Sequence, residues 1–353
     1  MARHLLKGSV LNGYRLTCAT STSNAGTSLW AFAEKQGRDY FVKSYLHPVY
    51  PLDDAPGSAP SKELKRRRCQ SFEQRMVCIK TELNRLPADQ CAARIVDFFR
   101  CDAFYYAVSE KIDAHRIEIA ALAAPEQLVL LMALAEALAL LHQQTRLIHG
   151  DIKPENMLIR RHGQRFIAKL VDFDSAFVDN HPPLGLSVDQ RYRSPERVAY
   201  QNDSKHATLD AKSDVFALGV VFCEYLTGSL PILSDGHPYI GEALANGGTF
   251  ELLPSIHREL RPVLETTRAM LRSDPTQRPS CAEVHHDLRL LHKKLFLHRV
   301  YHALPRLLPL LSEPLQALSS RPAQAKPSAL RIRGLNARPP SRSPLKYLLK
   351  PRD

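Results

Sequence analysis

One segment of this chain, LVLLMALAEALALLH at residues 128–142, is apolar on nearly every side of a helix and is interrupted by Glu136. A helix that is hydrophobic all round has no face to present to water, so it must lie inside other protein elements or inside a membrane. The segment has about 15 residues, fewer than the roughly 20 that a membrane span needs. Pro125, just before it, suits a first helical turn. We therefore predict a central buried helix and no transmembrane segment.

The composition is that of a globular chain. Of the 353 residues, 44% are apolar and 24% are charged, which is typical of folded domains and allows two or three structural units. The seven cysteines include no C-x-x-C pair, which argues against a zinc site or a disulfide framework and favours a reducing compartment. The N-terminal stretch MARHLLKGSV is too short and too polar for a signal peptide. The prediction for localisation is cytoplasmic.

The net charge of +12 is concentrated near the C-terminus. Residues 293–353 hold 13 Lys and Arg against two acidic residues, a balance of +11, so residues 1–292 carry only +1. Nine prolines fall in the same stretch, and one-sided charge with few aromatics predicts a disordered, Pro-rich basic tail over 305–353. The tail is either simply solvated or a cationic arm for an acidic partner, an anionic membrane surface or nucleic acid.

The first third of the chain is rich in strand patterns. Aromatic and β-branched residues between turn signals predict five short strands, at residues 13–20, 28–35, 39–46, 93–100 and 103–112. Residues 47–68 are rich in Pro, Gly, Ser and charge, and we interpret them as a surface loop or insertion. Apolar residues at helical spacing predict a helix over 71–86 with Ser71 as its N-cap. These elements form a first lobe, residues 1–110.

The rest of the folded part is mainly helical. The stretch NMLIRRHGQRFIAKLVDFD, residues 156–174, predicts a hairpin that turns near Gly163. Further helices are expected at residues 211–228, 255–271 and 281–303. The predicted fold class is α+β, with a strand-rich lobe carrying one helix followed by a helix-rich lobe over 111–304.

The stretch LIHGDIKPENMLI, residues 147–159, gathers His149, Asp151, Lys153 and Asn156 between two apolar runs. Pro and Asn favour turns, but a solvated turn does not explain apolar flanks in the middle of the chain. Four further motifs follow in order: VDFD at 171–174, RSPE at 193–196, KSDVFALG at 212–219 and DPTQRPS at 274–280. The meaning of the first motif therefore depends on the other four.

With these five motifs in this order, residues 13–290 resemble a eukaryotic-type serine/threonine protein kinase catalytic domain, and divergent bacterial members in particular. One motif alone would be modest evidence, whereas five in sequence are hard to obtain by coincidence. The resemblance implies a two-lobed kinase fold with a small antiparallel β-sheet lobe. It also implies ATP and Mg²⁺ as cofactors and a protein Ser or Thr hydroxyl as the acceptor.

The resemblance assigns the chemistry to a few side chains. Asp151 would orient the acceptor hydroxyl and take its proton, and Lys153 would face the transferring phosphate. Asn156 and Asp172 would bind Mg²⁺, because a hairpin between them returns both to the same end of two strands. Lysine at position 153 goes with serine/threonine substrates in this family.

Nucleotide contacts are assigned in the same way. Lys43 would bind phosphate, with a helix glutamate as its partner: Glu82 is favoured and Glu73 is the alternative. The remaining nucleotide contacts implied by the resemblance are Gly26, Glu110, Ile112 and Leu158.

Three more residues are expected to support the fold. Asp214 would be the buried acid that ties its helix to the catalytic loop. Glu196 and Arg278 would form a buried ion pair, and breaking such a pair costs about 3–5 kcal/mol.

Several positions depart from the family pattern. Gly26 stands alone where the family has three glycines, Phe41 replaces a small residue above the adenine, and Asp174 replaces the glycine of DFG. Asp189 replaces a threonine, and would either pair with Lys153 or repel Asp151.

Gly150 replaces the arginine of HRD, which leaves no obvious cation for a phosphorylated activation segment. We therefore hypothesise that activity does not require phosphorylation at Ser187 or Ser194. All these departures keep two alternatives open beside the enzyme. One is a pseudokinase that acts as a nucleotide-binding scaffold, and the other is a small-molecule phosphotransferase.

Overall fold

The computed structural model describes residues 4–22, 28–87, 90–163, 165–178, 188–202, 209–234 and 236–295. The chain divides into a unit Met1–Leu297 and a unit His298–Asp353, and the second unit lies outside the described residues. The predictions of a disordered tail over 305–353 and of a helix end at residue 303 therefore fall outside the part that can be described.

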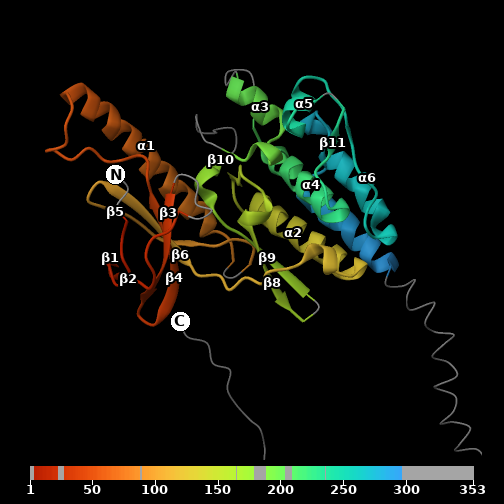
Figure 1. Ribbon diagram of the computed structural model, residues 1–353, viewed down its shortest axis with the longest axis horizontal. Helices are drawn as coiled ribbons and strands as arrows, with labels where there is room; N and C mark the ends of the chain where they lie inside the picture. Colours follow the sequence, from red (N-terminus) through yellow and green to blue (C-terminus); the bar gives the residue numbers. More distant parts are fainter. Residues whose placement is uncertain are drawn as a thin grey trace, which may run out of the picture. The chain divides into compact units, whose positions relative to one another are not determined.

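A six-stranded antiparallel sheet forms the first lobe (Figure 1). In spatial order its strands are β1 (Val10–Leu11), β2 (Tyr14–Leu16), β3 (Ser28–Lys35), β4 (Arg38–Tyr45), β6 (Phe104–Glu110) and β5 (Ile95–Cys101). The turn between β3 and β4 has positive φ at Gln36 and Gly37, the backbone twist that a tight hairpin requires. The long β3–β4 pair places Lys43 opposite Trp30 on one side and Ala107 of β6 on the other.

Helix α1 (Ala59–Leu83) is longer than predicted. The hydroxyl of Ser58 accepts a hydrogen bond from Ser61 N, and a proline occupies the first turn, which together make a good helix start. The run of Lys, Glu and Arg that follows has high helix propensity. The predicted loop over 47–68 therefore ends at Ser58, and the assignment of Ser71 as the N-cap is wrong.

The apolar face of α1 packs on the sheet through aromatic contacts. The ring of Phe72 lies 5.0 Å from Tyr45, 5.8 Å from Phe98 and 5.3 Å from Tyr105, centroid to centroid. Met76 is also buried on this face. Helix α1 is thus attached directly to the strand that carries Lys43.

Helix α2 (Ala124–Gln144) is the predicted central helix. Leucines 128, 130, 131, 134, 138 and 141 along it are fully buried. Among the described residues it is the one helix whose length and mean hydropathy of 1.6 would allow it to cross a membrane, and 67% of that window is buried inside the protein. Burial of this kind is what the core helix of a helical lobe requires, and helix α4 packs against it.

The second lobe contains several further elements (Figure 1). Its helices are α3 (Pro195–Asn202), α4 (Ala211–Thr227), α5 (Ile240–Ala245), α6 (Arg261–Met270) and a helix described over 281–295. A small sheet pairs β11 (Ile232–Leu233) with β12 (Phe250–Glu251). Short 3-10 helices lie at Ile119–Ala121, Pro154–Asn156, Phe173–Ser175, Gln190–Tyr192, Arg258–Leu260 and Pro275–Gln277. The two-lobed α+β fold is confirmed. All seven cysteines are free in the structure.

Two small antiparallel pairs position the polar motifs. The predicted hairpin forms from β8 (Met157–His162) and β9 (Arg165–Leu170), with Met157 opposite Leu170. Strand β7 (Leu147–Ile148) pairs with β10 (Phe177–Val178). Residues 149–156 and 171–176 therefore lie between the same two pairs of strands, side by side.

Candidate active site

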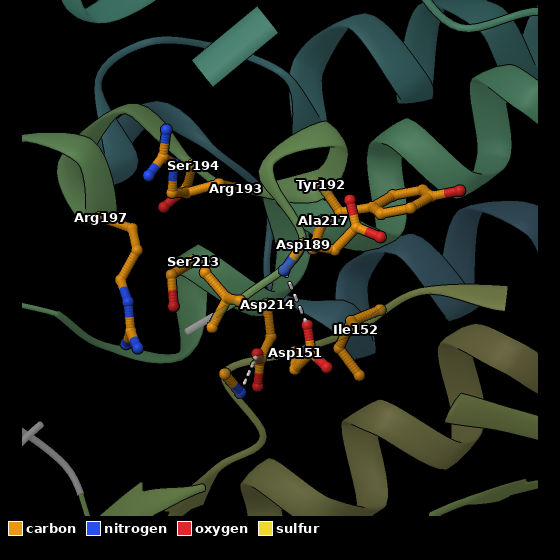
Figure 2. Close-up of a pocket in the computed structure, with 12 residues that line it drawn as sticks. Asp151, Ile152, Asp189, Tyr192, Arg193, Ser194, Arg197, Ser213, Asp214 and Ala217 are labelled. Carbon is orange, nitrogen blue, oxygen red and sulfur yellow. Dashed lines mark hydrogen bonds between the residues drawn. The ribbon is translucent and has the colours of Figure 1, made fainter. Parts of the chain in front are cut away.

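The carboxylate of Asp151 is held from three directions. Its Oδ2 accepts hydrogen bonds from Lys153 Nζ at 2.7 Å and from Asn156 Nδ2 at 2.9 Å. Its Oδ1 accepts one from the backbone N–H of Asp189 at 3.3 Å, as Figure 2 shows. The side chain keeps 12% of its surface exposed. The carboxylate is thus fixed in direction and still reachable from solvent, as a group that meets a substrate must be.

Asp214 anchors the loop that carries Asp151. It lies in the first turn of α4, is almost fully buried, and accepts the backbone N–H groups of His149 at 2.8 Å and Gly150 at 2.9 Å. His142 of α2 adds a third contact at 2.9 Å. Burial alone would raise the pKa of Asp214, but the hydrogen bond and charge of His142 and the loop contacts lower it below the ordinary value. Asp214 therefore joins α2, α4 and the loop as a carboxylate.

Steric exclusion explains why position 150 is a glycine, and the sequence did not reveal this reason. Gly150 has φ of +75°, and a Cβ there would lie 2.6 Å from the carbonyl oxygen of Ser175. An L side chain is strained at such a φ and would also collide with backbone. A cation does lie nearby, because the guanidinium of Arg197 from α3 sits over the Phe177 ring at 5.6 Å. Arg197 is 5% exposed, so the prediction that no cation receives a phosphorylated activation segment stays a prediction.

The β8–β9 hairpin brings Asn156 and Asp172 together. The backbone N–H of Val171 donates to the carbonyl of Asn156 at 2.9 Å. Asp172 follows with a left-handed backbone, φ of +63° and ψ of +67°. The hairpin thus returns Asp172 to the end of the strand pair where Asn156 lies.

The oxygen chemistry of this pair suits a magnesium ion. Within the described part of the chain, Asn156 Oδ1 and Asp172 Oδ2 accept no hydrogen bond, so both oxygens are available. No cluster of three or more His, Cys, Asp or Glu that could hold a metal occurs in the described ranges. Mg²⁺ commonly binds through one or two protein oxygens plus waters and phosphate. A magnesium ion held by these two oxygens would therefore complete its coordination with water and with the phosphates of a nucleotide.

Lys43 meets two carboxylates. Its Nζ lies 2.6 Å from Asp172 Oδ1 and 2.8 Å from Asp174 Oδ2. Burial alone would lower the pKa of Lys43, but the charges of Asp174 and Asp172 raise it. The same geometry shifts the pKa values of the two acids in opposite directions. Burial and the charge of Asp172 raise the pKa of Asp174, whereas the Lys43 ammonium outweighs burial and lowers the pKa of Asp172.

The glutamate predicted to pair with Lys43 points elsewhere. Glu82 is 1% exposed, and its carboxylate accepts hydrogen bonds from the backbone N–H and guanidinium of Arg146 and from Arg85. Glu73, the alternative, accepts from the Tyr105 hydroxyl at 2.6 Å. Both assignments to Lys43 are wrong. Glu82 lies one helical turn beyond Ile79, on the part of α1 that faces the start of β7.

The other predicted nucleotide contacts are placed in part. The segment after β6 runs along β8, because His115 N donates to the carbonyl of Ile159 at 2.8 Å. Ile112 lies in that segment and half-buried Leu158 lies on β8. Glu110 ends β6, and its carboxylate accepts from Lys169 at 3.0 Å. Gly26 lies outside the described residues.

The replacement at position 41 adds an aromatic ring to the sheet. Phe41 stacks on Trp30 with centroids 5.8 Å apart and meets Phe32 edge-on at 6.1 Å. Its side chain is therefore part of an aromatic cluster on β3 and β4.

The direct partner of Asp189 is Arg191, and the charge of Lys153 adds only a small effect on its pKa. Arg191 clamps its carboxylate through Nε at 3.1 Å and a second guanidinium nitrogen at 2.8 Å. The hydrogen bond from Arg191 is the main reason that the pKa of Asp189 is low. The acid is thus neutralised locally, and only its backbone N–H reaches Asp151. A small pocket beside this contact is lined by residues 150–152, by part of 188–197 and by α4 (Figure 2).

Glu196 and Arg278 form a bidentate ion pair, with N–O distances of 2.7 and 2.9 Å. The Arg278 side chain is 0% exposed, and it also donates to the backbone carbonyls of Arg272, Lys212 and Ser273. The start of α3 is therefore tied to the segment before the last helix.

Comparisons with known proteins agree with this geometry. Residues 62–288 match the family model described as a protein kinase domain. Serine/threonine-protein kinase ULK3 of Xenopus laevis is 33% identical over 165 residues, which are 45% of this chain and 33% of that protein. The serine/threonine-protein kinase PknA of Corynebacterium glutamicum is 34% identical over 160 residues, 44% of this chain and 31% of that protein.

A third relative is the dual specificity mitogen-activated protein kinase kinase sek-1 of Caenorhabditis elegans. It is 34% identical over 145 residues, 40% of this chain and 38% of that protein. The chain thus spans about a third of the length of these relatives. The family model, in contrast, matches well over half of the chain and includes most of helix α1, the Asp151 loop, the hairpin and the Arg278 pair. This chain belongs to the protein kinase family.

Proposed function

We propose that this chain is a serine/threonine protein kinase that transfers the γ-phosphoryl group of ATP to protein hydroxyls with the help of Mg²⁺. One observation carries the proposal. Lys153 and Asn156 hold the Asp151 carboxylate, and a backbone hydrogen bond from Val171 to Asn156 brings in the turn whose Asp172 pairs with Lys43. Phosphoryl transfer needs alignment and charge neutralisation more than covalent help, and this network supplies both.

The proton of the acceptor hydroxyl would go to Asp151. Its Oδ2 already accepts two hydrogen bonds from side chains, whereas Oδ1 accepts a single backbone N–H at 3.3 Å. Oδ1 is therefore the oxygen better able to take a hydroxyl proton. Lys153 pairs with this carboxylate at 2.7 Å, and its ammonium would neutralise charge on the phosphate oxygens during transfer.

A bound magnesium ion would neutralise charge on the nucleotide phosphates. Asn156 Oδ1 and Asp172 Oδ2 would hold it, and Lys43 would hold the phosphate from the opposite lobe. The preference for Ser and Thr rests on Lys153 and on the printed names of the relatives, two of which are serine/threonine kinases.

A pseudokinase is the second candidate. It is favoured by the aromatic cluster around Phe41 and by the two carboxylates that occupy Lys43. A protein that only binds nucleotide would not need Asp151 held by Lys153 and Asn156, and this is why the enzyme is preferred. The buried pair of Glu196 and Arg278, which braces the segment after residue 188, is our reason to prefer protein substrates over small molecules.

Incubation of the purified chain with Mg²⁺, radiolabelled ATP and a generic acceptor protein tests the proposal. Wild type is compared with Asp151→Asn and Asp172→Ala. Label on Ser or Thr in wild type alone supports the kinase. Nucleotide binding without label supports the pseudokinase, and label on a sugar or drug hydroxyl supports a small-molecule phosphotransferase.

We also propose a cytoplasmic location and an anionic partner for the basic tail, both from composition and charge. Binding to an acidic protein, anionic vesicles or nucleic acid that weakens with salt and is lost on deletion of 305–353 would support the second proposal. Equal binding by the full and shortened chains would reject it.

A further inference from the structure

The family resemblance implies that a glutamate of a helix pairs with Lys43, but the carboxylates that contact Lys43 come from another part of the chain. Helix α1 packs on β4 beside Lys43, yet neither of the glutamates considered, Glu73 and Glu82, reaches it. Both of its acidic partners, Asp172 and Asp174, come from the turn after β9. Asp172 is also the residue with a free oxygen toward a metal, which raises the question of what holds Lys43 when Asp172 binds the ion.

Asp174 is built into the surrounding structure at three points. Its Oδ1 accepts a hydrogen bond from the Tyr45 hydroxyl at 2.9 Å, and its Oδ2 lies 2.8 Å from Lys43 Nζ. Its backbone carbonyl accepts from the guanidinium of Arg75 on α1 at 2.6 Å. Because Tyr45 and Lys43 are two residues apart on β4, their side chains point from the same face of the strand, and both contact the Asp174 carboxylate.

We infer that Asp174 is the positioning residue for Lys43: it supplies the carboxylate that keeps the ammonium directed at the phosphate while Asp172 serves the metal. The inference rests on the proposed function and adds a division of labour between the two acids. Tyr45 occupies Oδ1 and leaves Oδ2 to Lys43, so the ion pair has one defined geometry.

The energetic reason lies in the burial of Lys43. Its side chain is only 12% exposed, and a buried ammonium without a partner is strongly unfavourable. When Asp172 turns to a metal and a nucleotide leaves, Asp174 remains the partner that holds Lys43 in place. A second acid in the turn therefore serves the function that a helix glutamate was expected to serve.

Helix α1 contacts this turn through a cation and not through the carboxylate that the resemblance implies. It donates a hydrogen bond from Arg75 to a backbone carbonyl, and the Sδ of its buried Met76 lies 4.0 Å from the Tyr45 hydroxyl. Lys43 and its carboxylate thus sit on β4 and on the turn, and no carboxylate of α1 takes part.

The test moves the carboxylate from position 174 in the turn to position 76 on α1. Asp174→Asn keeps the shape and removes the charge, and Met76→Glu places a carboxylate on α1 next to the same Tyr45 hydroxyl. We measure KM for ATP and kcat, together with the Kd of a fluorescent ATP analogue with and without Mg²⁺. Asp174→Asn should raise KM and Kd roughly tenfold with a smaller change in kcat, about the loss of one charged contact. Adding Met76→Glu should restore most of the affinity.

Asp39→Asn is the matched control, because Asp39 on the same strand forms an exposed pair with Lys111. It should leave KM and Kd unchanged within about twofold. A merely structural role for Asp174 would lower the melting temperature and leave Kd of the folded protein unchanged, and Met76→Glu would not rescue it. Asp174→Gly provides a second variant if Asp174→Asn does not fold, with the same expected rise in Kd.

Two outcomes separate this inference from the proposed function. If wild type binds the analogue but transfers no phosphate, the kinase proposal fails, and the Kd values still decide the role of Asp174. If Asp174→Asn and Asp174→Gly bind the analogue as wild type does, the inference is overturned even when the chain is an active kinase. Absence of nucleotide binding by wild type would overturn both.

Discussion

The backbone N–H of Gly150 donates to Oδ1 of Asp214 across 2.9 Å, and this contact sets the conformation of the loop that carries Asp151. Gly150 has a left-handed backbone, and the neighbouring carbonyl of Ser175 fills the place that a side chain would take. The glycine is therefore a consequence of how tightly the loop and the turn after β9 are packed.

Gly150→Ala should lower the free energy of unfolding by about 2 kcal/mol or more, because it combines left-handed strain with a backbone collision. Gly163→Ala is the control: its φ is +61° and nothing lies within 4 Å of a Cβ there. The control should lose only about 1 kcal/mol. Urea unfolding of both variants measures the difference, and equal losses would contradict the role assigned to Ser175.

Asp214 should make stability depend on acid. Its pKa is lower in the folded chain than the ordinary value, so its contribution is present above the unfolded pKa, about 3.9, and is lost as pH falls through the folded value. Wild type should lose more stability between pH 6 and pH 3 than Asp214→Asn, which has no proton to take up there. Urea midpoints at the two pH values test this, and parallel losses in both proteins would count against it.

Arg278→Ala should damage folding more than chemistry. It would leave Glu196 without its bidentate partner and would remove one donor from each of three backbone carbonyls, at a cost of about 3–5 kcal/mol. Arg268→Ala, which breaks the exposed pair with Glu265, should cost only about 0–1 kcal/mol. Thermal unfolding and activity per folded molecule are measured together. Unchanged melting with lost activity would show that the pair acts on chemistry.

Activity should not depend on phosphorylation of the segment before α3. Ser194 is 2% exposed, so its hydroxyl is poorly placed as an acceptor, and Ser187 lies outside the described residues. Phosphatase-treated wild type and Ser187→Ala should show kcat/KM within about threefold of untreated wild type. A large gain in turnover on phosphorylation at either position would refute this prediction and would direct attention to the guanidinium of Arg197.

The comparison of sequence and structure is most instructive in helix α1. The spacing of Phe72, Met76 and Ile79 predicted its buried face correctly, because apolar periodicity reports burial directly. The start of the helix was missed because the Pro-, Ser- and Lys-rich run before it resembles a loop in composition. A Ser followed by Pro in a first turn was the available signal for the true start at Ser58.

The partner of Lys43 could not be predicted from such patterns. Glu73, Glu82 and Asp174 all carry carboxylates, and their distances to Lys43 depend on how α1 and the β9 turn pack on β4. The DFD sequence did contain a hint, since two acids flank one aromatic residue where a single acid was expected. The packing of β4, α1 and the turn after β9, which are far apart in the chain, decides which carboxylate contacts the Lys43 ammonium.

The order of motifs and the periodicity of apolar residues were enough to establish the family, the two-lobed α+β fold and the central buried helix, because these signals are local and each residue carries them independently of distant contacts. Tertiary structure alone decided that Lys43 meets Asp174 and that the carbonyl of Ser175 excludes a side chain at position 150. Ion pairing and steric exclusion act over a few ångströms between segments far apart in sequence, so they are settled only when those segments pack.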